Sequence, residues 1–213
     1  MRRQGIYAIT SEELSPPDIF LQHVEQALLG GVAAVQYRNK TADQHLRLEQ
    51  ARALVALCRR YETPLLINDD VSLCLAVGAD GVHLGQQDGD CARTRSCLGP
   101  DAIIGVTCHD SLERASRAQE QGASYVAFGR FFPSRTKPEA PAAAIQVLAQ
   151  ARQVLRIPIV AIGGITTENG AQLITAGADL LAVIHDLFGA RDITAKACAL
   201  RALFHSDTEV HHA

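Results

Sequence analysis

The chain has no run of arginine or lysine, no Cys-x-x-Cys pair and no apolar stretch long enough to cross a bilayer. Its 20 basic and 23 acidic residues are scattered and give a net charge of -3, so we expect no nucleic-acid partner. A membrane span would need about 18 consecutive apolar residues, so none is expected. Six cysteines spread along the chain are expected to be buried apolar side chains in a reducing compartment and do not favour a structural zinc site.

Several catalytic signatures are also missing. The sequence contains no Walker-type phosphate loop, no dinucleotide fingerprint and no visible serine, histidine and acid arrangement. Residues 1–4, which precede the first apolar run, are too few for a secretory signal, so we expect a cytoplasmic protein. These absences remove nucleotide-dependent and serine-hydrolase chemistry from the first hypotheses.

A short apolar run followed by a helical stretch recurs about every 25 residues. Hydrophobic residues make up 47 % of the chain, which suffices for a large buried core. The apolar runs are nearly continuous, and this favours strands buried on both faces of a parallel sheet. We expect eight such strands, over residues 5–10, 33–38, 64–69, 81–85, 103–108, 125–129, 158–163 and 180–185.

Helices are predicted between these strands, most clearly at 42–60, 112–121 and 142–154. Glycines after several of them suit the left-handed position that follows a helix. Helix starts carry side chains that can accept a hydrogen bond from the first turn. These are Thr41, Asp110-Ser111 and Thr166-Thr167.

Eight alternating strand and helix units in about 200 residues predict an α/β fold, a (β/α)₈ TIM barrel. The barrel is expected to form one catalytic domain over residues 1–204. A doubly wound open sheet is the alternative. The polar segment 205–213 is predicted to be a frayed tail and not a metal site.

Barrel enzymes place their sites at the carboxyl ends of the strands, and here those ends are polar. Gln36, Arg38 and Lys40 lie two residues apart at the end of the second predicted strand. In an extended segment, this spacing points all three side chains the same way. An arginine beside a lysine is repelled unless an anion lies between them, and a guanidinium matches phosphate oxygens. We therefore predict a phosphate or diphosphate site, with a solvated strand end as the alternative.

Asp69 and Asp88 follow two neighbouring predicted strands. Mg²⁺ suits such a pair, because it is commonly bound by one or two carboxylates while water and substrate phosphate oxygens fill its remaining ligand positions. We predict a Mg²⁺ site opposite the basic pair. Helix capping is the alternative for Asp88 and the preferred interpretation for Asp70.

The loop after the sixth predicted strand carries hydroxyls and a cation at Ser134, Thr136 and Lys137. These groups are expected to surround a phosphate or to cover the barrel mouth, and an exposed turn is the alternative. After the seventh strand, Gly163-Gly164 would allow backbone N–H groups to approach an anion, or would simply form a tight turn.

Two histidines lie near the predicted strand ends. His83 lies inside a predicted strand and is expected to be a core histidine with satisfied hydrogen bonds. His109 follows the next strand, where it either reaches the site or caps a helix.

Six segments, in chain order, resemble a known family. They are QYRNK (36–40), IND (67–69), ADGVHLGQQD (79–88), GVTCH (105–109), FGRFFPSRTK (128–137) and VAIGGI (160–165). Together they resemble the thiamine-phosphate synthase family, from about Ile6 to Leu203. The resemblance implies a TIM-barrel transferase of thiamine biosynthesis. It would join 4-amino-5-hydroxymethyl-2-methylpyrimidine diphosphate to thiazole phosphate, which carries a carboxylate in some cases, and release diphosphate.

The resemblance also implies a role for each matching residue. Asp69 and Asp88 would hold Mg²⁺. Arg38, Thr107 and Lys137 would serve catalysis, with Thr107 near the pyrimidine where the family usually has serine. The pyrimidine diphosphate would contact Gln36, Arg38, Lys40 and Asn68. The thiazole partner and the leaving diphosphate would contact Ser134, Thr136 and Lys137, and the thiazole phosphate would contact Gly164, Ile184 and His185.

Three positions depart from the family pattern. Ser134 replaces a common threonine, Arg130 follows Gly129 where proline is frequent, and His185 replaces a frequent serine. None of them removes a charge or a metal ligand from the implied site.

Two other functions remain as alternatives. One is a thiazole tautomerase-like isomerase, which would need neither the basic pair nor the two carboxylates. The other is a non-catalytic thiamine-precursor binding protein, which turnover would distinguish. For the assembly, a homodimer is kept as an open expectation.

Overall fold

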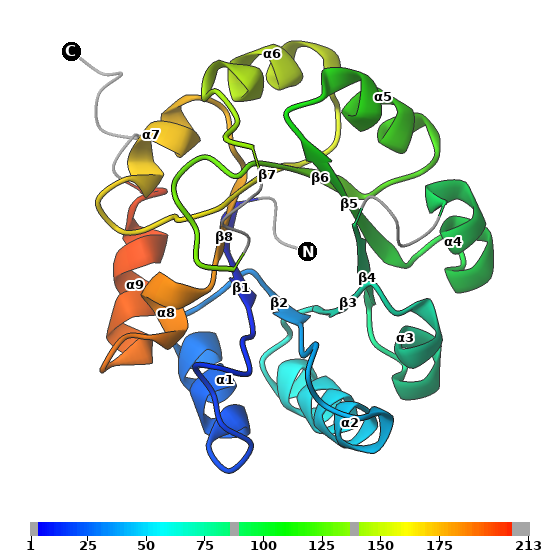
Figure 1. The fold of residues 1–213 in the computed structure, drawn as a ribbon, viewed down its shortest axis with the longest axis vertical. Helices are drawn as coiled ribbons and strands as arrows, with labels where there is room; N and C mark the ends of the chain where they lie inside the picture. Colours follow the sequence, from blue (N-terminus) through cyan, green and yellow to red (C-terminus); the bar gives the residue numbers. More distant parts are fainter. Residues whose placement is uncertain (1–3, 86–89, 137–140, 206–213) are drawn as a thin grey trace.

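Eight parallel strands close into a barrel, in the order in which they occur along the chain, in this computed structural model. The structure describes residues 4–85, 90–136 and 141–205. Figure 1 looks along the barrel and shows the strands as an inner ring. The strands are β1 (Gly5–Ile9), β2 (Ala34–Tyr37), β3 (Leu65–Asn68), β4 (Gly81–Leu84), β5 (Ile103–His109), β6 (Tyr125–Phe128), β7 (Ile159–Ile162) and β8 (Leu180–Val183).

The pairing of β1 with β8 decides the fold class. Tyr7 lies in register with Ala182 in that pair, so the sheet has no free edge among these eight strands. The TIM-barrel prediction is therefore confirmed, and the open doubly wound alternative is wrong. All eight predicted strands are present, each within about two residues of its expected bounds.

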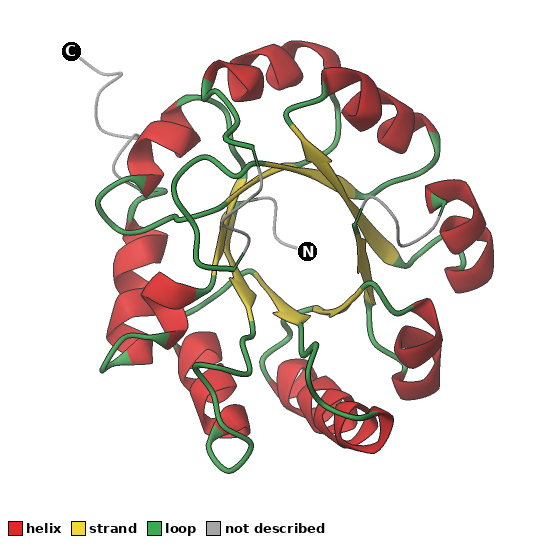
Figure 2. Cartoon of the chain, viewed as in Figure 1, coloured by secondary structure: helices red, strands yellow, loops and turns green. Residues whose placement is uncertain are grey.

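The helices form an outer ring around the strands, as Figure 2 shows. They are α1 (Phe20–Leu29), α2 (Gln44–Arg60), α3 (Val71–Val77), α4 (Cys91–Leu98), α5 (Leu112–Glu120), α6 (Gln146–Val154), α7 (Gly170–Thr175), α8 (His185–Phe188) and α9 (Ile193–Ala202). None of the helices in the described ranges has both the length and the apolarity needed to cross a bilayer.

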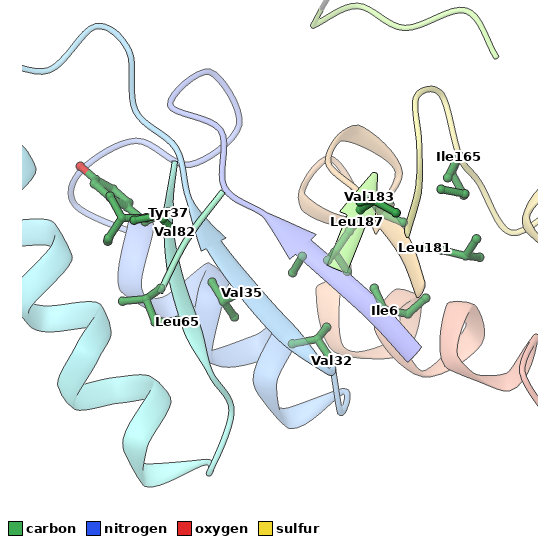
Figure 3. Close-up of a cluster of buried hydrophobic side chains, with 14 of the residues drawn as sticks. Ile6, Val32, Val35, Tyr37, Leu65, Val82, Ile165, Leu181, Val183 and Leu187 are labelled. Carbon is green, nitrogen blue, oxygen red and sulfur yellow. The ribbon is translucent and has the colours of Figure 1, made fainter. Parts of the chain in front are cut away.

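Side chains alternate along each strand between two apolar layers. On β1, Ile6 and Ala8 belong to the larger layer between the strands and the helices, while Tyr7 and Ile9 belong to the smaller layer inside the barrel. Figure 3 shows part of the outer layer, where Val35 and Leu65 lie close to neighbouring strands and helices. This alternation determines which strand residues can reach a cavity at the barrel mouth.

Two of the predicted helix starts are wrong. Asp43, and not Thr41, caps α2, because its carboxylate accepts a hydrogen bond from the backbone N–H of Leu46. Helix α7 begins only after Asn169, beyond the expected Thr166-Thr167 cap. The cap at Ser111 is confirmed by its hydrogen bond from Arg114 N–H.

Two other boundaries also differ from expectation. Helix α6 begins at Gln146, four residues later than predicted, because Ala143 N–H bonds to Arg130 C=O in the preceding loop. Strand β8 ends at Val183, so His185 is the first residue of the short α8 and not the end of a strand. Residues 206–213 of the predicted tail lie outside the described residues, and the division at residue 204 stays a prediction.

Candidate functional site

A cavity of about 560 Å³ opens at the carboxyl ends of the strands. It gathers side chains and backbone from all eight strand ends, as expected for this fold. Asp88 and Lys137, two of the predicted site residues, lie outside the described residues. The other predicted site residues all line this one cavity: Gln36, Arg38, Lys40, Asn68, Asp69, Thr107, Ser134, Thr136, Gly164, Ile184 and His185.

The basic residues of the rim follow strand β2. Gln36 lies within the strand, and Arg38 and Lys40 continue the same direction past its end. Thr10, just after β1, fixes this segment, because its hydroxyl accepts from Arg38 N–H at 2.9 Å and donates to Arg38 C=O at 3.1 Å. The backbone that carries both cations is therefore held by the neighbouring strand end.

Two carboxylates already face these cations. Glu12 Oε2 lies 4.0 Å from Arg38 Nη1, and Asp69 Oδ2 lies 3.4 Å from Lys40 Nζ. The repulsion between Arg38 and Lys40 is thus partly balanced without a bound anion. Glu12 also accepts from Lys40 N–H at 3.3 Å. Sequence reasoning missed Glu12 because it lies in the first loop, outside every quoted motif.

Asp69 has a strained backbone. Its φ of 63° lies in the left-handed region, which is unfavourable for a residue other than glycine. Its N–H bonds to His83 C=O at 2.8 Å, and its Oδ2 accepts from Asn68 Nδ2 at 2.6 Å. Such strain, about 1–3 kcal/mol, is concentrated at functional sites and here places a carboxylate on the cavity wall.

A Mg²⁺ ion would suit this carboxylate. Mg²⁺ commonly takes one or two protein carboxylates and completes its shell with water and phosphate oxygens. No group of three potential His, Cys, Asp or Glu ligands is found among the described residues. Asp69 therefore fits as one ligand of a site that is completed largely by substrate and water. Asp70 does not take part, because it caps α3 through Leu73 N–H at 2.8 Å and pairs with Arg47 at 2.8 Å.

The floor of the cavity carries a connected set of polar side chains. Gln36 Nε2 donates to Tyr7 Oη at 2.7 Å, and Tyr7 Oη lies 2.8 Å from Tyr125 Oη. Tyr125 Oη lies 2.8 Å from His83 Nδ1, and His83 Nε2 lies 2.8 Å from Thr107 Oγ1. These five side chains come from five different strands.

Burial keeps the two phenols of the floor uncharged. Tyr7 and Tyr125 are essentially inaccessible, and desolvation raises the pKa of both phenols above the ordinary value. The expectation of a core histidine with satisfied hydrogen bonds is confirmed for His83. The tyrosines were missed because they lie inside apolar runs that the sequence assigns only to the core.

The glycine pair after β7 serves close packing. Gly163 and Gly164 have φ values of 105° and 62°. A Cβ on Gly164 would lie 2.3 Å from the carbonyl oxygen of Pro133, and Phe132 N–H bonds to Gly163 C=O at 3.1 Å. The loop after β6 therefore rests directly on this turn. Both glycines also line the cavity.

The family model described as thiamine monophosphate synthase matches residues 6–187 of the chain.

The chain belongs to the thiamine monophosphate synthase family.

Named relatives agree with this family. The chain is 55% identical over 202 residues to a thiamine-phosphate synthase of Saccharophagus degradans, covering 94% of this chain and 93% of that protein. It is 53% identical over 201 residues to a thiamine-phosphate synthase of Methylobacillus flagellatus, covering 94% and 95% of the two chains. The resemblance carried by the six sequence motifs is thereby confirmed.

A solved structure is also similar. The thiamine phosphate pyrophosphorylase from Pyrococcus furiosus superposes with a TM-score of 0.87 at 33% identity, covering 96% of each chain. The agreement extends over the whole barrel and not over a shared fragment.

All three departures from the family pattern lie at the cavity. Ser134, Arg130 and His185 each line it. His109 lines it as well, with a left-handed φ of 55°, so of its two predicted roles the structure favours reaching the site. Helix capping falls to Ser111 instead.

Two further lining residues lay outside the sequence prediction for this family. Arg135 belongs to the loop after β6, and Asp186 belongs to the first turn of α8. Asp186 is held by Lys196 Nζ at 3.2 Å and by Thr167 N–H at 3.2 Å. Arg135 could have been predicted as a lining residue, because it lies between Ser134 and Thr136, which were both predicted to belong to the site.

Proposed function

We propose that the protein joins 4-amino-5-hydroxymethyl-2-methylpyrimidine diphosphate to thiazole phosphate, giving thiamine phosphate and diphosphate. The observation that carries the proposal is the division of one cavity into a rim of charged side chains and a largely buried floor of tyrosine, glutamine, histidine and threonine side chains. The rim suits two phosphate-bearing substrates, and the floor suits an uncharged heterocycle. Membership in the thiamine monophosphate synthase family supports the same activity.

The leaving diphosphate needs compensation of its charge. Arg38 and Lys40 lie where they can bind its oxygens, and the family pattern adds Lys137. Phosphate oxygens of the incoming substrate would replace the carboxylates of Glu12 and Asp69 as partners of these cations. Asn68 would contact the same group.

A Mg²⁺ cofactor belongs to this proposal, with Asp69 and Asp88 as its protein ligands. When bound, Mg²⁺ would act as a Lewis acid that neutralises negative charge on the diphosphate. Asp69 offers its carboxylate at the rim, next to the proposed diphosphate position. Its strained backbone supports a functional role for this residue.

The reacting rings would lie deeper in the cavity. Apolar side chains from β1, β6, β7 and β8 line it there, namely Ile9, Ala127, Val160 and Ala182. The electron-rich aminopyrimidine can support a methylene cation once the diphosphate departs. The thiazole nitrogen then needs only to be held nearby, so positioning replaces a side-chain nucleophile.

The thiazole phosphate would bind at the ends of β7 and β8, away from the proposed diphosphate position at the ends of β2 and β3. Gly164, Ile184 and His185 lie together on the cavity wall and would hold the thiazole phosphate. Ser134 and Thr136 from the loop after β6 would contact the thiazole partner or the departing diphosphate. Thr107 would contact the pyrimidine from the floor.

Turnover of the purified protein tests the proposal directly. Both substrates with Mg²⁺ should give thiamine phosphate and diphosphate in equal amounts, and chelation of the metal should abolish both. Asp69→Asn and Asp88→Asn should each need more Mg²⁺ and lose activity, because each removes charge and keeps shape. Asp43→Asn is the matched control, since Asp43 caps α2 away from the cavity.

Two results would overturn the proposal. Isomerisation of the thiazole without condensation would favour the tautomerase alternative, and binding without turnover would favour the precursor-binding alternative. A cytoplasmic location also belongs to the proposal, as does the absence of a nucleic-acid partner, which the scattered charges and the net charge of -3 support. The homodimer stays a prediction for sedimentation analysis.

A further inference from the structure

The loop after β1 carries a glutamate next to the proposed diphosphate cations. Glu12 lies in a turn that Ser11 closes, because the Ser11 carbonyl oxygen accepts from the N–H groups of Leu14 and Ser15 at 3.2 and 3.1 Å. This turn fixes the backbone from which the carboxylate extends. Arg38 lines the cavity and Glu12 does not, so the carboxylate approaches the guanidinium from outside the cavity wall.

The two oxygens of the Glu12 carboxylate have different surroundings. Oε1 accepts from the backbone N–H of Lys40 at 3.3 Å. Oε2 is buried, accepts no hydrogen bond from the described residues and lies 4.0 Å from Arg38 Nη1. A buried carboxylate oxygen without a donor is unfavourable, because its contacts with water are lost and not replaced. Oε2 is therefore an acceptor that a nearby donor would stabilise.

Arg38 has unused donors at the same place. A guanidinium has five N–H donors. The Arg38 side chain is only 17% exposed, yet its guanidinium donates no hydrogen bond to the described residues, whereas the backbone of Arg38 bonds to Thr10. The separation of 4.0 Å from Glu12 exceeds a usual hydrogen bond by about 1 Å, so a small rotation would join the two groups. The guanidinium can thus turn toward Glu12 or toward an anion in the cavity.

The proposed reaction increases the negative charge that Arg38 meets. When the bond between the pyrimidine methylene and the diphosphate breaks, the leaving oxygen keeps the electron pair. Free diphosphate therefore carries more negative charge than the esterified group, and the same cations attract it more strongly. Slow product release limits the turnover of many enzymes. A carboxylate that takes back the guanidinium would counter this tight binding.

We propose that Glu12 is a positioning residue that competes with diphosphate for the guanidinium of Arg38 and thereby assists release of the product. This inference rests on the proposed function. The side chains of Arg38 and Glu12 are 17% and 20% exposed, against 52% and 27% for Lys40 and Asp69. Solvent and salt screen a less exposed pair more weakly, so Glu12 is the stronger competitor of the two rim carboxylates.

Glu12→Gln should tighten the binding of inorganic diphosphate in the presence of Mg²⁺. The amide can still accept from Lys40 N–H, but it no longer attracts the guanidinium by charge. The apparent affinity of a ligand falls with the fraction of protein that is ready to bind it, so removing the competitor should lower the Kd by at least about fivefold. Titration calorimetry measures this Kd without turnover.

Glu13→Gln is the matched control. It removes the same charge one residue further along, from an exposed side chain that does not line the cavity. It should change the Kd for diphosphate by less than about twofold, because exposed charges are screened by solvent. Thiazole phosphate is the reference ligand, since its proposed position lies at the ends of β7 and β8. Wild type and Glu12→Gln should bind it equally.

A second background tests whether Glu12 acts through Arg38. In Arg38→Ala, Lys40 and Mg²⁺ remain to bind diphosphate, but the contested guanidinium is gone. Adding Glu12→Gln to this background should therefore give no further gain in affinity. In steady-state kinetics, the inhibition constant for diphosphate and the KM for the pyrimidine diphosphate should fall together in Glu12→Gln, and kcat should not rise.

The outcomes separate the inference from the function. Unchanged or weaker diphosphate binding in Glu12→Gln would reduce Glu12 to a support for the Lys40 backbone and would overturn the competition. An equal gain in the Arg38→Ala background would overturn it as well, because the effect would then be a general one of charge. A protein that shows the expected binding pattern but condenses no substrates would overturn the proposed function and retain the competition for Arg38.

Discussion

The floor and the rim of the cavity recognise ligands by different physical means. The floor is largely buried and is held by a chain of hydrogen bonds of 2.7 to 2.8 Å between strands. The rim is charged and more accessible, with side-chain exposures of 52% for Lys40 and 27% for Asp69. Its ion pairs lie at 3.4 and 4.0 Å, longer than a direct hydrogen bond.

This difference assigns separate tasks to the two regions. A preformed floor can discriminate against a ring whose hydrogen-bond pattern is reversed, because a buried polar group left without a partner costs about 1–3 kcal/mol. The rim carboxylates lie 3.4 and 4.0 Å from their cations, beyond the usual hydrogen-bond distance, so phosphate oxygens can take their place. Variants that act on one region alone should therefore separate ring selection from diphosphate binding.

Removal of a rim cation should have the largest effect. Arg38→Ala should lower kcat/KM by roughly 100-fold, or about 2.7 kcal/mol, because diphosphate loses a bidentate partner. The preference for the aminopyrimidine diphosphate over its 4-oxo analogue, measured as the ratio of the two kcat/KM values, should stay unchanged, since the floor is intact. Arg152→Ala is the control, because Arg152 pairs with Asp179 and does not line the cavity. A changed preference in Arg38→Ala would contradict the separation of tasks.

The second-largest effect is expected from a methyl group added beneath the floor. Gly105→Ala should destabilise the fold by about 2 kcal/mol, because the new Cβ overlaps the Tyr125 ring. Urea denaturation measures the free energy of unfolding. In a Tyr125→Leu background, the same change should cost clearly less, because the ring is gone. Equal costs in the two backgrounds would place the strain elsewhere.

A substitution at the proposed thiazole-phosphate position should have a smaller effect. His185→Ser should change the affinity for thiazole phosphate by less than about tenfold, or 1.4 kcal/mol, if the backbone of Gly164, Ile184 and His185 makes the contact. Titration calorimetry measures this affinity across the pH range in which imidazole titrates. A larger loss that followed imidazole protonation would instead assign the contact to the side chain.

The smallest effect at neutral pH concerns the ionisation of the floor. Burial raises the pKa of Tyr7 and Tyr125 above the ordinary value of 10.0. The folded state therefore favours the protonated phenols, and this contribution is complete below pH 10. It is lost as the pH rises from about 10 toward the folded-state pKa, because the unfolded chain ionises first. The part of the free energy of unfolding that Tyr7 and Tyr125 contribute should thus decline above about pH 10, so the decline should be shallower in Tyr7→Phe than in the wild type.

The strands of the barrel were predictable because each carries a continuous apolar run. Parallel strands that are covered on both faces have no polar side, so each strand appears in the sequence as an apolar run without alternation. Helix starts were less predictable. Thr41 and Asp43 are both good capping residues, and only the path of the chain selects Asp43.

The rim was also predictable, whereas most of the floor was not. Arg38, Lys40 and Asp69 stand out because charges rarely follow a buried strand without a reason. Tyr7 and Tyr125 instead read as core, because an aromatic residue in an apolar run is usual there. Their hydroxyls meet only when the barrel closes and brings β1 and β6 to opposite sides of one interior.

The composition of the floor also gives the protein an optical probe. The chain has no tryptophan and only four tyrosines, and two of these, Tyr7 and Tyr125, form the cavity floor. No indole is present to accept excitation energy or to dominate the near-ultraviolet spectrum. The intrinsic tyrosine emission and circular dichroism of this enzyme should therefore report the arrival of a heterocycle without any label.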